Sequence, residues 1–493
     1  MEPPSFVWDR DVSHGGFTPG QTYTLDPASQ NTPLDATAAS YRPPPPQVPV
    51  TYDTFIGLPS YRDGKRCGFT IFTAFSRAVN PDRLVVGVVD QTAPGDAACV
   101  DEYCKLAATH WPEDGGDCRY RNRVHVDARA AQESTGPIGA RAILHGLIRD
   151  EEFCLVMDSH MQFLPDWDTA LVTDWARAEN EMAVLSVYPT GFETIGPNLT
   201  PPVKLTRHNC YFAHESLPTI PDFGAILIDH STRPQMGAFI GAGFQFSKCH
   251  AQTRVPLDAR LKWVFLGEEF LRSMQLWTQG YDIYSPSRVG HVVFHDETPK
   301  DQTTLNGSYS ENRGKDPNQA TELELSLNRM RKQLHLPVVG PTDDVDIDKY
   351  YLPPVRSVEK YLNFSGVSAK DLALDRWPCG QLHWVPYDDP APVEALLPGY
   401  SMTNPRPMAV RTPKPVVKDT SKPMIADNPV NVAVRQVADG SWEGLYDVYL
   451  LAAAVVVAVL AAGLFVARRR SHQSASMLYE PVAVKDDDGE SDM

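Results

Sequence analysis

The chain has 493 residues, of which 42% are hydrophobic and 22% are charged, and its formal net charge is -17 at pH 7. This length and composition are sufficient for a large buried core, and the length alone permits two or three domains. The negative charge argues against a nucleic-acid partner held through its phosphates, because such partners need a clustered basic face.

The first 50 residues form a Pro-rich arm that contains the cluster RPPPPQVP, Arg42 to Pro49. Residues 1–50 show little apolar periodicity, so we expect this arm to be disordered or extended as polyproline II. The N-terminal sequence MEPPSFVWDRDVSHGG has neither the basic region nor the apolar region of a secretory signal peptide, and we expect no such signal there.

Residues 51–335 carry the pattern of an α/β domain. Short apolar runs alternate with amphipathic stretches, which predicts βα units and a Rossmann-like, mostly parallel sheet. The expected strands are Thr54–Leu58, Leu84–Val89, Val124–Val126, Phe153–Met157, Met182–Tyr188 and Tyr281–Tyr284. The expected helices are Gly68–Val79, one that begins at Pro137, Glu268–Trp277 and Ala320–His335. After Pro189 the sequence becomes irregular.

Composition divides the rest of the chain into four parts. Residues 336–400 are a Pro-rich extension, and residues 401–447, rich in Pro, Val, Lys and Asn, resemble a stalk. Residues 448–467, VYLLAAAVVVAVLAAGLFVA, contain no charge and match the thickness of a bilayer core, which predicts one transmembrane helix. Residues 468–493 form a short polar tail.

Charges at the two ends of this span bear on its orientation. Arg468, Arg469 and Arg470 follow the span, and Glu443 and Asp447 precede it. The positive-inside tendency therefore favours a cytosolic tail and a head in the lumen of the endoplasmic reticulum or Golgi. The alternative is a tail anchor with a cytosolic head, since no signal peptide is present to carry a head of this size across a membrane.

Eight cysteines are scattered through the chain: Cys67, Cys99, Cys104, Cys118, Cys154, Cys210, Cys249 and Cys379. They include no C-x-x-C pair and no zinc-finger spacing. They can be buried thiols or form two or three disulfides.

The motif Asp158-Ser159-His160 directly follows the apolar run FCLVM. Its two ligand-type side chains therefore stand at the carboxyl end of a buried strand, where open α/β sheets bind ligands. A carboxylate and an imidazole two residues apart can hold one divalent cation, and this donor pair suits Mn²⁺. A loop aspartate that caps the next helix, beside a surface histidine, has the same pattern.

Six segments, in order, give the sequence a resemblance to a known family. They are IGLPSYRDGKRC (Ile56–Cys67), VVGVVDQ (Val85–Gln91), Gly136–Asp168, FIGAGFQF (Phe239–Phe246), Val264–Pro286 and RVGHVVFHDE (Arg288–Glu297). Together they resemble the N-acetylglucosaminyltransferases that modify hydroxyproline, serine or threonine in polypeptides, which are related to the mucin-type polypeptide N-acetylgalactosaminyltransferases. The resemblance implies the GT-A-type nucleotide-diphospho-sugar transferase fold.

The resemblance implies that five residues contact the nucleotide of a UDP-sugar: Ser60, Tyr61, Arg62, Gln91 and Arg141. Tyr61 can stack on a base, and Arg62 can bind phosphate. Purely structural roles are the alternatives, namely a turn with an ion pair at Arg62, a polar strand end at Gln91 and a helix-surface arginine at Arg141.

The resemblance also implies three metal ligands and a pair of catalytic carboxylates. Asp158, His160 and one histidine of the last segment would hold Mn²⁺ or Mg²⁺; we predict His295, although His291 is closer to the mucin-type relatives. The carboxylates are Glu268 and Glu269, which would contact sugar hydroxyls or the acceptor. Favourable negative charge at a helix N-terminus is their structural alternative.

The predicted protein is thus a membrane-anchored, metal-dependent transferase. The resemblance implies transfer of GlcNAc from UDP-GlcNAc, with retention, to a polypeptide hydroxyl on Ser, Thr or hydroxyproline. Two alternatives stay open: a transferase that uses another UDP-sugar, and a non-catalytic carbohydrate-binding or scaffold protein with the same fold. Leu58-Pro59, where the family has smaller residues, and the lack of an N-terminal anchor depart from the family pattern.

Overall fold

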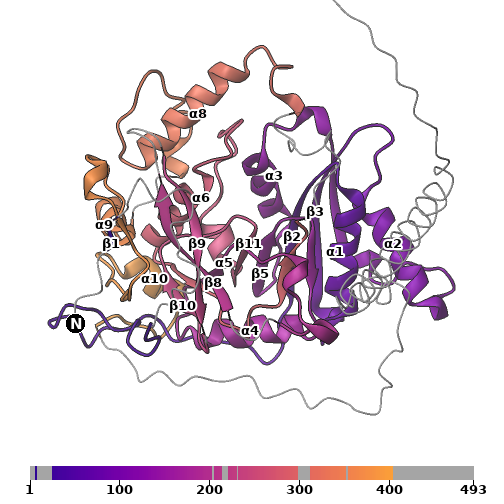
Figure 1. The fold of residues 1–493 in the computed structure, drawn as a ribbon, viewed down its shortest axis with the longest axis horizontal. Helices are drawn as coiled ribbons and strands as arrows, with labels where there is room; N and C mark the ends of the chain where they lie inside the picture. The colour runs from indigo at the N-terminus through magenta and orange to yellow at the C-terminus, as the bar shows by residue number, and fades with distance from the viewer. Residues whose placement is uncertain are drawn as a thin grey trace, which may run out of the picture. The chain divides into compact units, whose positions relative to one another are not determined.

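The computed structural model describes residues 6–7, 25–201, 205–213, 220–229, 231–297, 311–350 and 354–403 (Figure 1). All of these residues belong to one compact unit, residues 1–419. The predicted transmembrane span, the polar tail and the predicted stalk from residue 404 on lie outside the described residues. Within the described ranges, no helix combines the length and the hydrophobicity that crossing a bilayer requires.

The centre of the domain is an eight-stranded sheet with the order β10-β12-β7-β11-β5-β2-β3-β4 (Figure 1). Its strands are β2 (Thr54–Tyr61), β3 (Leu84–Thr92), β4 (Val124–Ala130), β5 (Phe153–Met157), β7 (Ala183–Ser186), β10 (Gln235–Gly237), β11 (Phe244–Lys248) and β12 (Asp282–Ser285). Pairing is antiparallel only where β11 meets β5 and β7 and where β10 meets β12. The predicted mixed α/β fold with a large, mostly parallel sheet is confirmed.

Helices pack on both faces of this sheet. They are α1 (Gly64–Ser76), α2 (Cys99–His110), α3 (Pro137–Leu144), α4 (Trp167–Arg177), α5 (His250–Arg254), α6 (Glu268–Thr278), α8 (Gln319–Gln333), α9 (Val358–Ser365) and α10 (Ala391–Leu396). Alternate side chains of a strand point to opposite faces. Accordingly, Val86 and Val88 share a core cluster with Phe75 of α1, whereas Val89 packs with Leu144 of α3.

Among the described residues, three two-stranded pairings lie outside the central sheet. The strands β6 (Met161–Phe163) and β13 (Val293–His295) pair antiparallel, as do β8 (Leu205–Ala213) with β9 (Asp222–Asp229) and β1 (Phe6–Val7) with β14 (Arg376–Trp377). The sequence between Pro189 and β10 has no regular strand pattern. The β8–β9 hairpin in this segment was therefore not predicted. The β6–β13 pair lies at the candidate site described below.

Residues 25–50 of the Pro-rich arm, which was expected to be disordered or extended as polyproline II, make specific contacts with the domain. The Gln30 amide donates to the carbonyl oxygen of Pro234 at 2.8 Å and accepts the N–H of Met236 at 2.8 Å. The Asn31 amide donates to the carbonyl oxygen of Ala178 at 2.6 Å. The arm is held because its buried amide side chains satisfy backbone groups of the domain.

The Pro-rich extension after residue 335 is also part of the packed domain. Arg356 is fully buried and donates to Asp282 at 2.8 Å and to the carbonyl oxygen of Tyr281 at 2.8 Å. Its guanidinium lies 3.9 Å from the ring centroid of Trp277 on α6. The extension therefore fixes the C-terminal end of α6.

All eight cysteines form disulfides. The structure therefore contains four bridges, where the sequence led us to expect buried thiols or two or three bridges. The pairs are Cys67–Cys99, Cys104–Cys118, Cys154–Cys249 and Cys210–Cys379. The last pair joins β8 to the extension across 169 residues of sequence. Each bridge removes conformational freedom from the unfolded chain, and the gain grows with the length of the loop closed.

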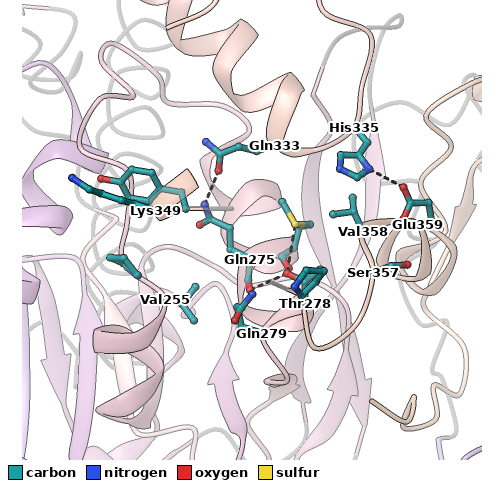
Figure 2. Close-up of a pocket in the computed structure, with 14 residues that line it drawn as sticks. Val255, Gln275, Thr278, Gln279, Gln333, His335, Lys349, Ser357, Val358 and Glu359 are labelled. Carbon is teal, nitrogen blue, oxygen red and sulfur yellow. Dashed lines mark hydrogen bonds and ion pairs between the residues drawn. The ribbon is translucent and has the colours of Figure 1, made fainter. Parts of the chain in front are cut away.

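A cavity of about 120 Å³ lies beside the C-terminal half of α6, between this helix, the end of α8 and the start of α9 (Figure 2). Its walls include Gln275 of α6, Gln279 directly after this helix, Gln333 of α8 and Val358 of α9.

Candidate active site

The candidate site lies at the carboxyl ends of the parallel strands β2, β3 and β5, which is where open α/β sheets bind ligands. Tyr61 ends β2, Gln91 stands near the end of β3, and Asp158 directly follows β5. The N-terminal end of α6 adds Glu268, and the short strand β13 adds His295. The sheet thus brings the sequence-predicted residues to one edge.

Asp158, His160 and His295 form a cluster with the chemistry of a cation site. One ligand atom of each residue lies within 4.8 Å of one ligand atom of the others. The Nε2 atoms of His160 and His295 are 3.0 Å apart, and the two rings are nearly perpendicular, at 75°. When two nitrogens bind the same metal ion at about 2.1 Å and the N–metal–N angle is about 90°, the nitrogens lie about 3.0 Å apart. The distance between the two histidines therefore fits a shared cation.

The pairing of β6 with β13 brings His295 to His160. His295 lies opposite Met161 in the antiparallel register. The N–H of His295 donates to the carbonyl oxygen of Thr190 at 2.9 Å, and the N–H of Asp296 donates to the carbonyl oxygen of His160 at 2.9 Å. Backbone hydrogen bonds at His295 and at the next residue therefore set the position of His295.

The other candidate, His291, points elsewhere. Its Nε2 atom is 2.8 Å from the hydroxyl of Thr190, and its ring stacks on Phe294 at 4.8 Å. Burial lowers the pKa of His291 to about 4. His291 is a buried neutral histidine, and the structure brings His295, not His291, to the other two predicted ligands.

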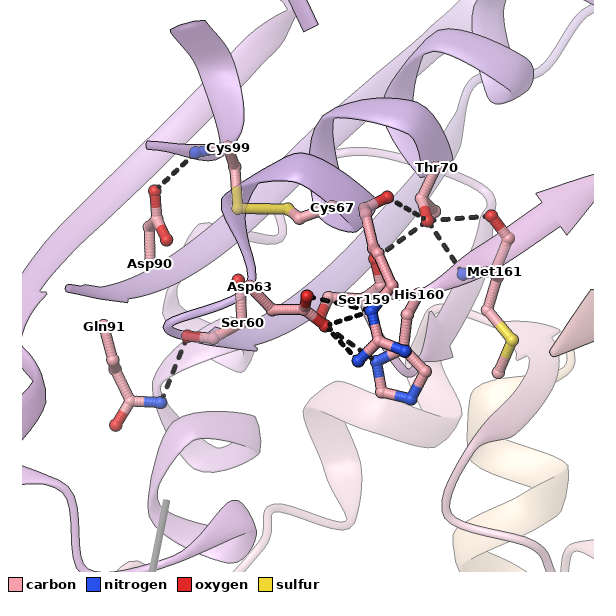
Figure 3. The surroundings of a disulfide bond; sticks show 11 residues. Ser60, Asp63, Cys67, Thr70, Asp90, Gln91, Cys99, Ser159, His160 and Met161 are labelled. Atoms are coloured by element: carbon pink, nitrogen blue, oxygen red, sulfur yellow. Dashed lines mark hydrogen bonds and ion pairs between the residues drawn. A yellow bond between two sulfur atoms is a disulfide. The ribbon is translucent and has the colours of Figure 1, made fainter. Parts of the chain in front are cut away.

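Two residues lie next to His160 and its neighbours in sequence: Asp63, the N-cap of α1, and Thr70, within α1. Neither was among the predicted site residues. Asp63 places Oδ2 3.3 Å from His160 Nδ1 and is itself paired with Arg66 at 2.7 Å (Figure 3). The Thr70 hydroxyl lies 2.8 Å from the carbonyl oxygens of Ser159 and Met161 and donates its one proton to either of them. A carboxylate that bonds one ring nitrogen of a histidine orients the other nitrogen toward a metal. Asp63 is placed for this role, although its 3.3 Å approach to Nδ1 is not a hydrogen bond here. A carboxylate one residue after the Ser-Tyr-Arg motif is the signal that could have indicated Asp63.

A disulfide next to these two residues joins α1 to α2. Figure 3 shows Cys67 bonded to Cys99 beside Asp63, and the Cys99 N–H donates to Asp90 Oδ2 at 2.8 Å. The two helices are in close contact because Gly68 presents no side chain: a Cβ there would lie 2.6 Å from the backbone nitrogen of Tyr103. Through the Cys67–Cys99 bridge, α1, which carries Asp63 and Thr70, is therefore connected to Asp90 near the end of β3.

Arg141 of α3 lies between two acidic groups of the site. Its guanidinium donates to Glu268 at 2.7 and 2.9 Å and to Asp158 Oδ1 at 3.0 Å. Burial opposes the charge on Asp158, but Arg141, His160 and His295 outweigh it and hold the pKa of Asp158 below its ordinary value. Arg141 thus keeps Asp158 ionised, which is the state that binds a cation.

Glu269, the second predicted carboxylate, faces the glycine-bearing segment. It accepts the N–H of Ala242 at 2.7 Å and the hydroxyl of Tyr188. Burial raises the pKa of Glu269 to about 7. Next to Ala242, a Cβ on Gly243 would lie 2.8 Å from Asp158 Oδ2, so the backbone there approaches the predicted metal ligand closely.

The predicted nucleotide contacts divide into two groups. Ser60 and Gln91 are buried in the strand ends, with the Gln91 amide 3.4 Å from the carbonyl oxygen of Ser60. Tyr61 and Arg62 are partly exposed. Arg62 has the left-handed φ of 49°, uncommon for a non-glycine residue, and its N–H is held by the carbonyl oxygen of Gln91 at 2.8 Å.

Glu311 binds both exposed members of this set. Its Oε2 atom accepts the Tyr61 hydroxyl at 2.9 Å and the Arg62 guanidinium at 2.8 Å. Asp96 accepts two further bonds from Arg62, at 2.8 and 3.1 Å. Glu311 is 249 residues from Arg62 in sequence, and no local pattern predicts the contact.

Comparison with known proteins identifies the family to which these residues belong. A family model described as glycosyltransferase (GlcNAc) matches residues 53–371. No curated protein matches the chain.

Among solved structures, the chain is similar to GalNAc-T7 with UDP, GalNAc and Mn²⁺, at 13% identity and a TM-score of 0.40 over 63% of this chain and 56% of that one. It is also similar to the mannosyltransferase PcManGT from Pyrobaculum calidifontis in complex with GDP-Man and Mn²⁺, at 12% identity and 0.32 over 59% and 75%. A third is S. aureus TarS in complex with UDP-GlcNAc, at 12% identity and 0.33 over 64% and 74%. The chain thus matches little more than half the length of the GalNAc-T7 chain.

Proposed function

We propose that this chain, which belongs to the GlcNAc glycosyltransferase family and is a glycosyltransferase, transfers GlcNAc from UDP-GlcNAc. The proposed acceptor is a polypeptide hydroxyl, and the proposed reaction depends on a metal ion. The observation that carries the proposal is the cluster of Asp158, His160 and His295 at the carboxyl edge of the sheet. The family description names the sugar, and the cluster supports the metal dependence.

The donor atoms of this cluster fit a divalent transition metal. The site offers one carboxylate, which Arg141 keeps ionised, and two imidazole nitrogens 3.0 Å apart. Mg²⁺ prefers a nearly complete shell of oxygen atoms, whereas imidazole nitrogen suits Mn²⁺ and its neighbours. We therefore favour Mn²⁺ over Mg²⁺. When bound, the cation would neutralise the charge that develops on the leaving UDP.

The chain's own residues prepare the site for a nucleotide diphosphate. Tyr61 and Arg62 offer an aromatic face and a guanidinium at the carboxyl ends of the strands, and Asp63 Oδ2 lies 3.3 Å from His160 Nδ1. These groups favour a base, a phosphate and a metal in one place. In the structure, Glu311 accepts hydrogen bonds from both Tyr61 and Arg62. A UDP-sugar that bonds to these two side chains would therefore have to displace Glu311.

The acidic groups around α6 are proposed to shape the sugar site. Glu268 is held by Arg141, so it positions charge and does not act as a free base. Glu269 remains for contacts with sugar hydroxyls or the acceptor, with its pKa near 7 through burial. We propose retention of configuration and a Ser, Thr or hydroxyproline acceptor on the strength of the family resemblance alone.

We further propose that the chain is anchored by residues 448–467 and that its head lies in the lumen of the endoplasmic reticulum or Golgi. The four disulfides support this orientation over the cytosolic head, because disulfides persist in oxidising compartments and are rare in the cytosol. The arginines after the span favour the same orientation.

The test is release of UDP by the full chain from a panel of UDP-sugars, with Mn²⁺ or with EDTA, beside an Asp158→Ala variant. Turnover of UDP-GlcNAc that needs the metal and is lost in the variant supports the proposal. Preference for UDP-GalNAc, UDP-glucose or UDP-galactose would change the donor. Absence of UDP binding in folded protein with Mn²⁺ would contradict transferase activity and favour the non-catalytic alternative.

A further inference from the structure

The cavity beside α6 is separate from the residues of the proposed reaction. It measures about 120 Å³, and none of the predicted nucleotide, metal or catalytic residues lines it. One water needs a cavity of at least about 10–15 Å³, so this cavity is several times larger than one water requires and can admit a ligand of the size of one sugar ring.

Amide side chains form its polar wall. Gln275 donates to Gln333 at 3.0 Å (Figure 2). Gln333 in turn donates to Asp258 at 3.1 Å. Gln279, which directly follows α6, also lines the cavity. These amides carry no net charge and present both donors and acceptors, which suits hydroxyl or acetamido groups.

One acceptor in this wall is left without a partner. Gln275 is only 4% exposed, and within the described part of the chain its Oε1 atom accepts no hydrogen bond. Buried polar atoms in folded proteins are nearly always bonded, so an unbonded one in a residue that lines a cavity calls for a donor. The oxygen is covered in this conformation, so a ligand hydroxyl would supply that donor after a small rotation of the Gln275 side chain.

The remaining walls favour a neutral ligand with an apolar face. Met274, Pro256 and Val358 supply apolar surface, and Tyr350 supplies an aromatic ring. The charged groups at the rim are paired within the protein. His335 is 2.7 Å from Glu359, as Figure 2 shows, and Lys349 is 2.9 Å from Asp346. Among its described lining residues, the cavity therefore offers no unpaired cation to a phosphate and no unpaired carboxylate to an amine.

From this size, this amide wall and these neutral surroundings, we propose that the cavity is a second carbohydrate site, which binds one neutral pyranose unit such as a hexose or N-acetylhexosamine. It goes beyond the proposed function, because the donor site is at the other end of α6. Glu268 begins this helix and Gln275 is seven residues on, so about 10 Å of helix axis separates them. The site would bind sugar without a metal and without UDP.

The test is saturation-transfer difference NMR on the full chain with free N-acetylglucosamine, in the presence of excess UDP and Mg²⁺ to fill the donor site, because Mg²⁺ is diamagnetic and leaves the sugar signals sharp. Gln275→Leu removes the unpartnered oxygen at nearly constant size, and Tyr350→Ala removes the ring. Gln381→Leu is the matched control, because Gln381 lies outside the cavity and bonds the N–H of Asp26. Asp158→Ala is the control for the donor site.

We expect saturation transfer to the sugar in the wild type, in Gln381→Leu and in Asp158→Ala, and binding at least about fivefold weaker in Gln275→Leu and in Tyr350→Ala, as the loss of one contact predicts. Equal binding in all variants would overturn the proposal, as would loss in Asp158→Ala or no transfer in the wild type at millimolar sugar. If Gln275→Leu does not fold, Tyr350→Ala decides. Metal-dependent UDP binding, measured in the same samples, separates failure of this site from failure of the proposed transferase.

Discussion

His160 and His295 place their Nε2 atoms 3.0 Å apart although 135 residues separate them in sequence. The contact follows from the antiparallel register of β6 and β13, in which His295 lies opposite Met161. The two nitrogens are within hydrogen-bonding distance of each other, and one ligand atom of each of the three residues lies within 4.8 Å of the others, Asp158 included. A cation held by these atoms would bind both rings through Nε2, and Asp63 is near the Nδ1 atom of His160.

Replacing His295 with alanine should lower Mn²⁺ affinity by at least about 100-fold, since loss of groups that only support a ligand already costs 10–100-fold. Isothermal titration of the purified chain with Mn²⁺, in the presence of UDP, measures this. His291→Ala is the control: His291 bonds Thr190 and not the cluster, so this variant should lose stability but keep Mn²⁺ affinity within a few-fold. The opposite pattern would assign the third ligand to His291.

Asp63→Asn tests the support of His160. The variant keeps the size of the side chain but removes the charge near His160 Nδ1, and we expect Mn²⁺ affinity to fall about 10–100-fold. Asp168→Asn is a matched control, because Asp168 accepts the backbone N–H groups of Val79 and Asn80 and should affect stability alone. Unchanged Mn²⁺ affinity in Asp63→Asn would show that Asp63 only pairs with Arg66.

Local patterns predicted the parts of the fold that depend on neighbouring residues. The strand at Phe153–Met157 was expected with its observed bounds, because five apolar residues end at a polar motif. The helix at Glu268 begins where expected and ends one residue later than expected, at Thr278. These elements are fixed by periodicity and by their terminal residues, both of which can be read from the sequence.

Contacts between distant segments could not be predicted from periodicity. The Pro-rich arm and extension have compositions typical of linkers, yet Gln30 and Arg356 bury polar groups against the core because the domain offers them partners. Glu311 reaches Tyr61 from a charged stretch with no distinctive pattern. His295 was preferred over His291 through the family resemblance, and only the strand pairing shows why their rings lie in different places.

Glu269 should make stability depend on pH. Burial raises its pKa from 4.5 to about 7, so between these values the folded state binds a proton that the unfolded state has lost. The free energy of unfolding from this group therefore falls as pH rises from about 4.5 to 7, by at most about 3 kcal/mol. Glu269→Gln removes this contribution. Urea unfolding at pH 5 and pH 8 should show a smaller decrease in the variant than in the wild type. Equal decreases would contradict a raised pKa at Glu269.

The bridge between Cys210 and Cys379 should stabilise the packing of the extension. The double variant Cys210→Ser with Cys379→Ser should lower the free energy of unfolding by about 2–5 kcal/mol, because the bridge closes a long loop. Chemical denaturation under non-reducing conditions measures this loss. In the wild type unfolded in denaturant, alkylation should label no cysteine before reduction and all eight after it, since unfolding exposes these buried residues. Labelling of Cys210 or Cys379 before reduction would contradict the pairing and weaken the case for a lumenal head.

Glu311 should compete with the donor for Tyr61 and Arg62. Its carboxylate bonds both side chains, at 2.9 and 2.8 Å, and a nucleotide that contacts them must displace it. Glu311→Ala frees the Tyr61 hydroxyl and one side of the Arg62 guanidinium, and one charge-assisted hydrogen bond corresponds to about a tenfold change in affinity. We therefore expect UDP to bind about three- to tenfold more tightly in the variant, as measured by titration with Mn²⁺ present. Glu322→Ala, which removes a carboxylate bonded to Lys262 and Trp263, should leave UDP affinity unchanged. Weaker UDP binding in Glu311→Ala would mean instead that Glu311 holds Tyr61 and Arg62 in the geometry that binds the nucleotide.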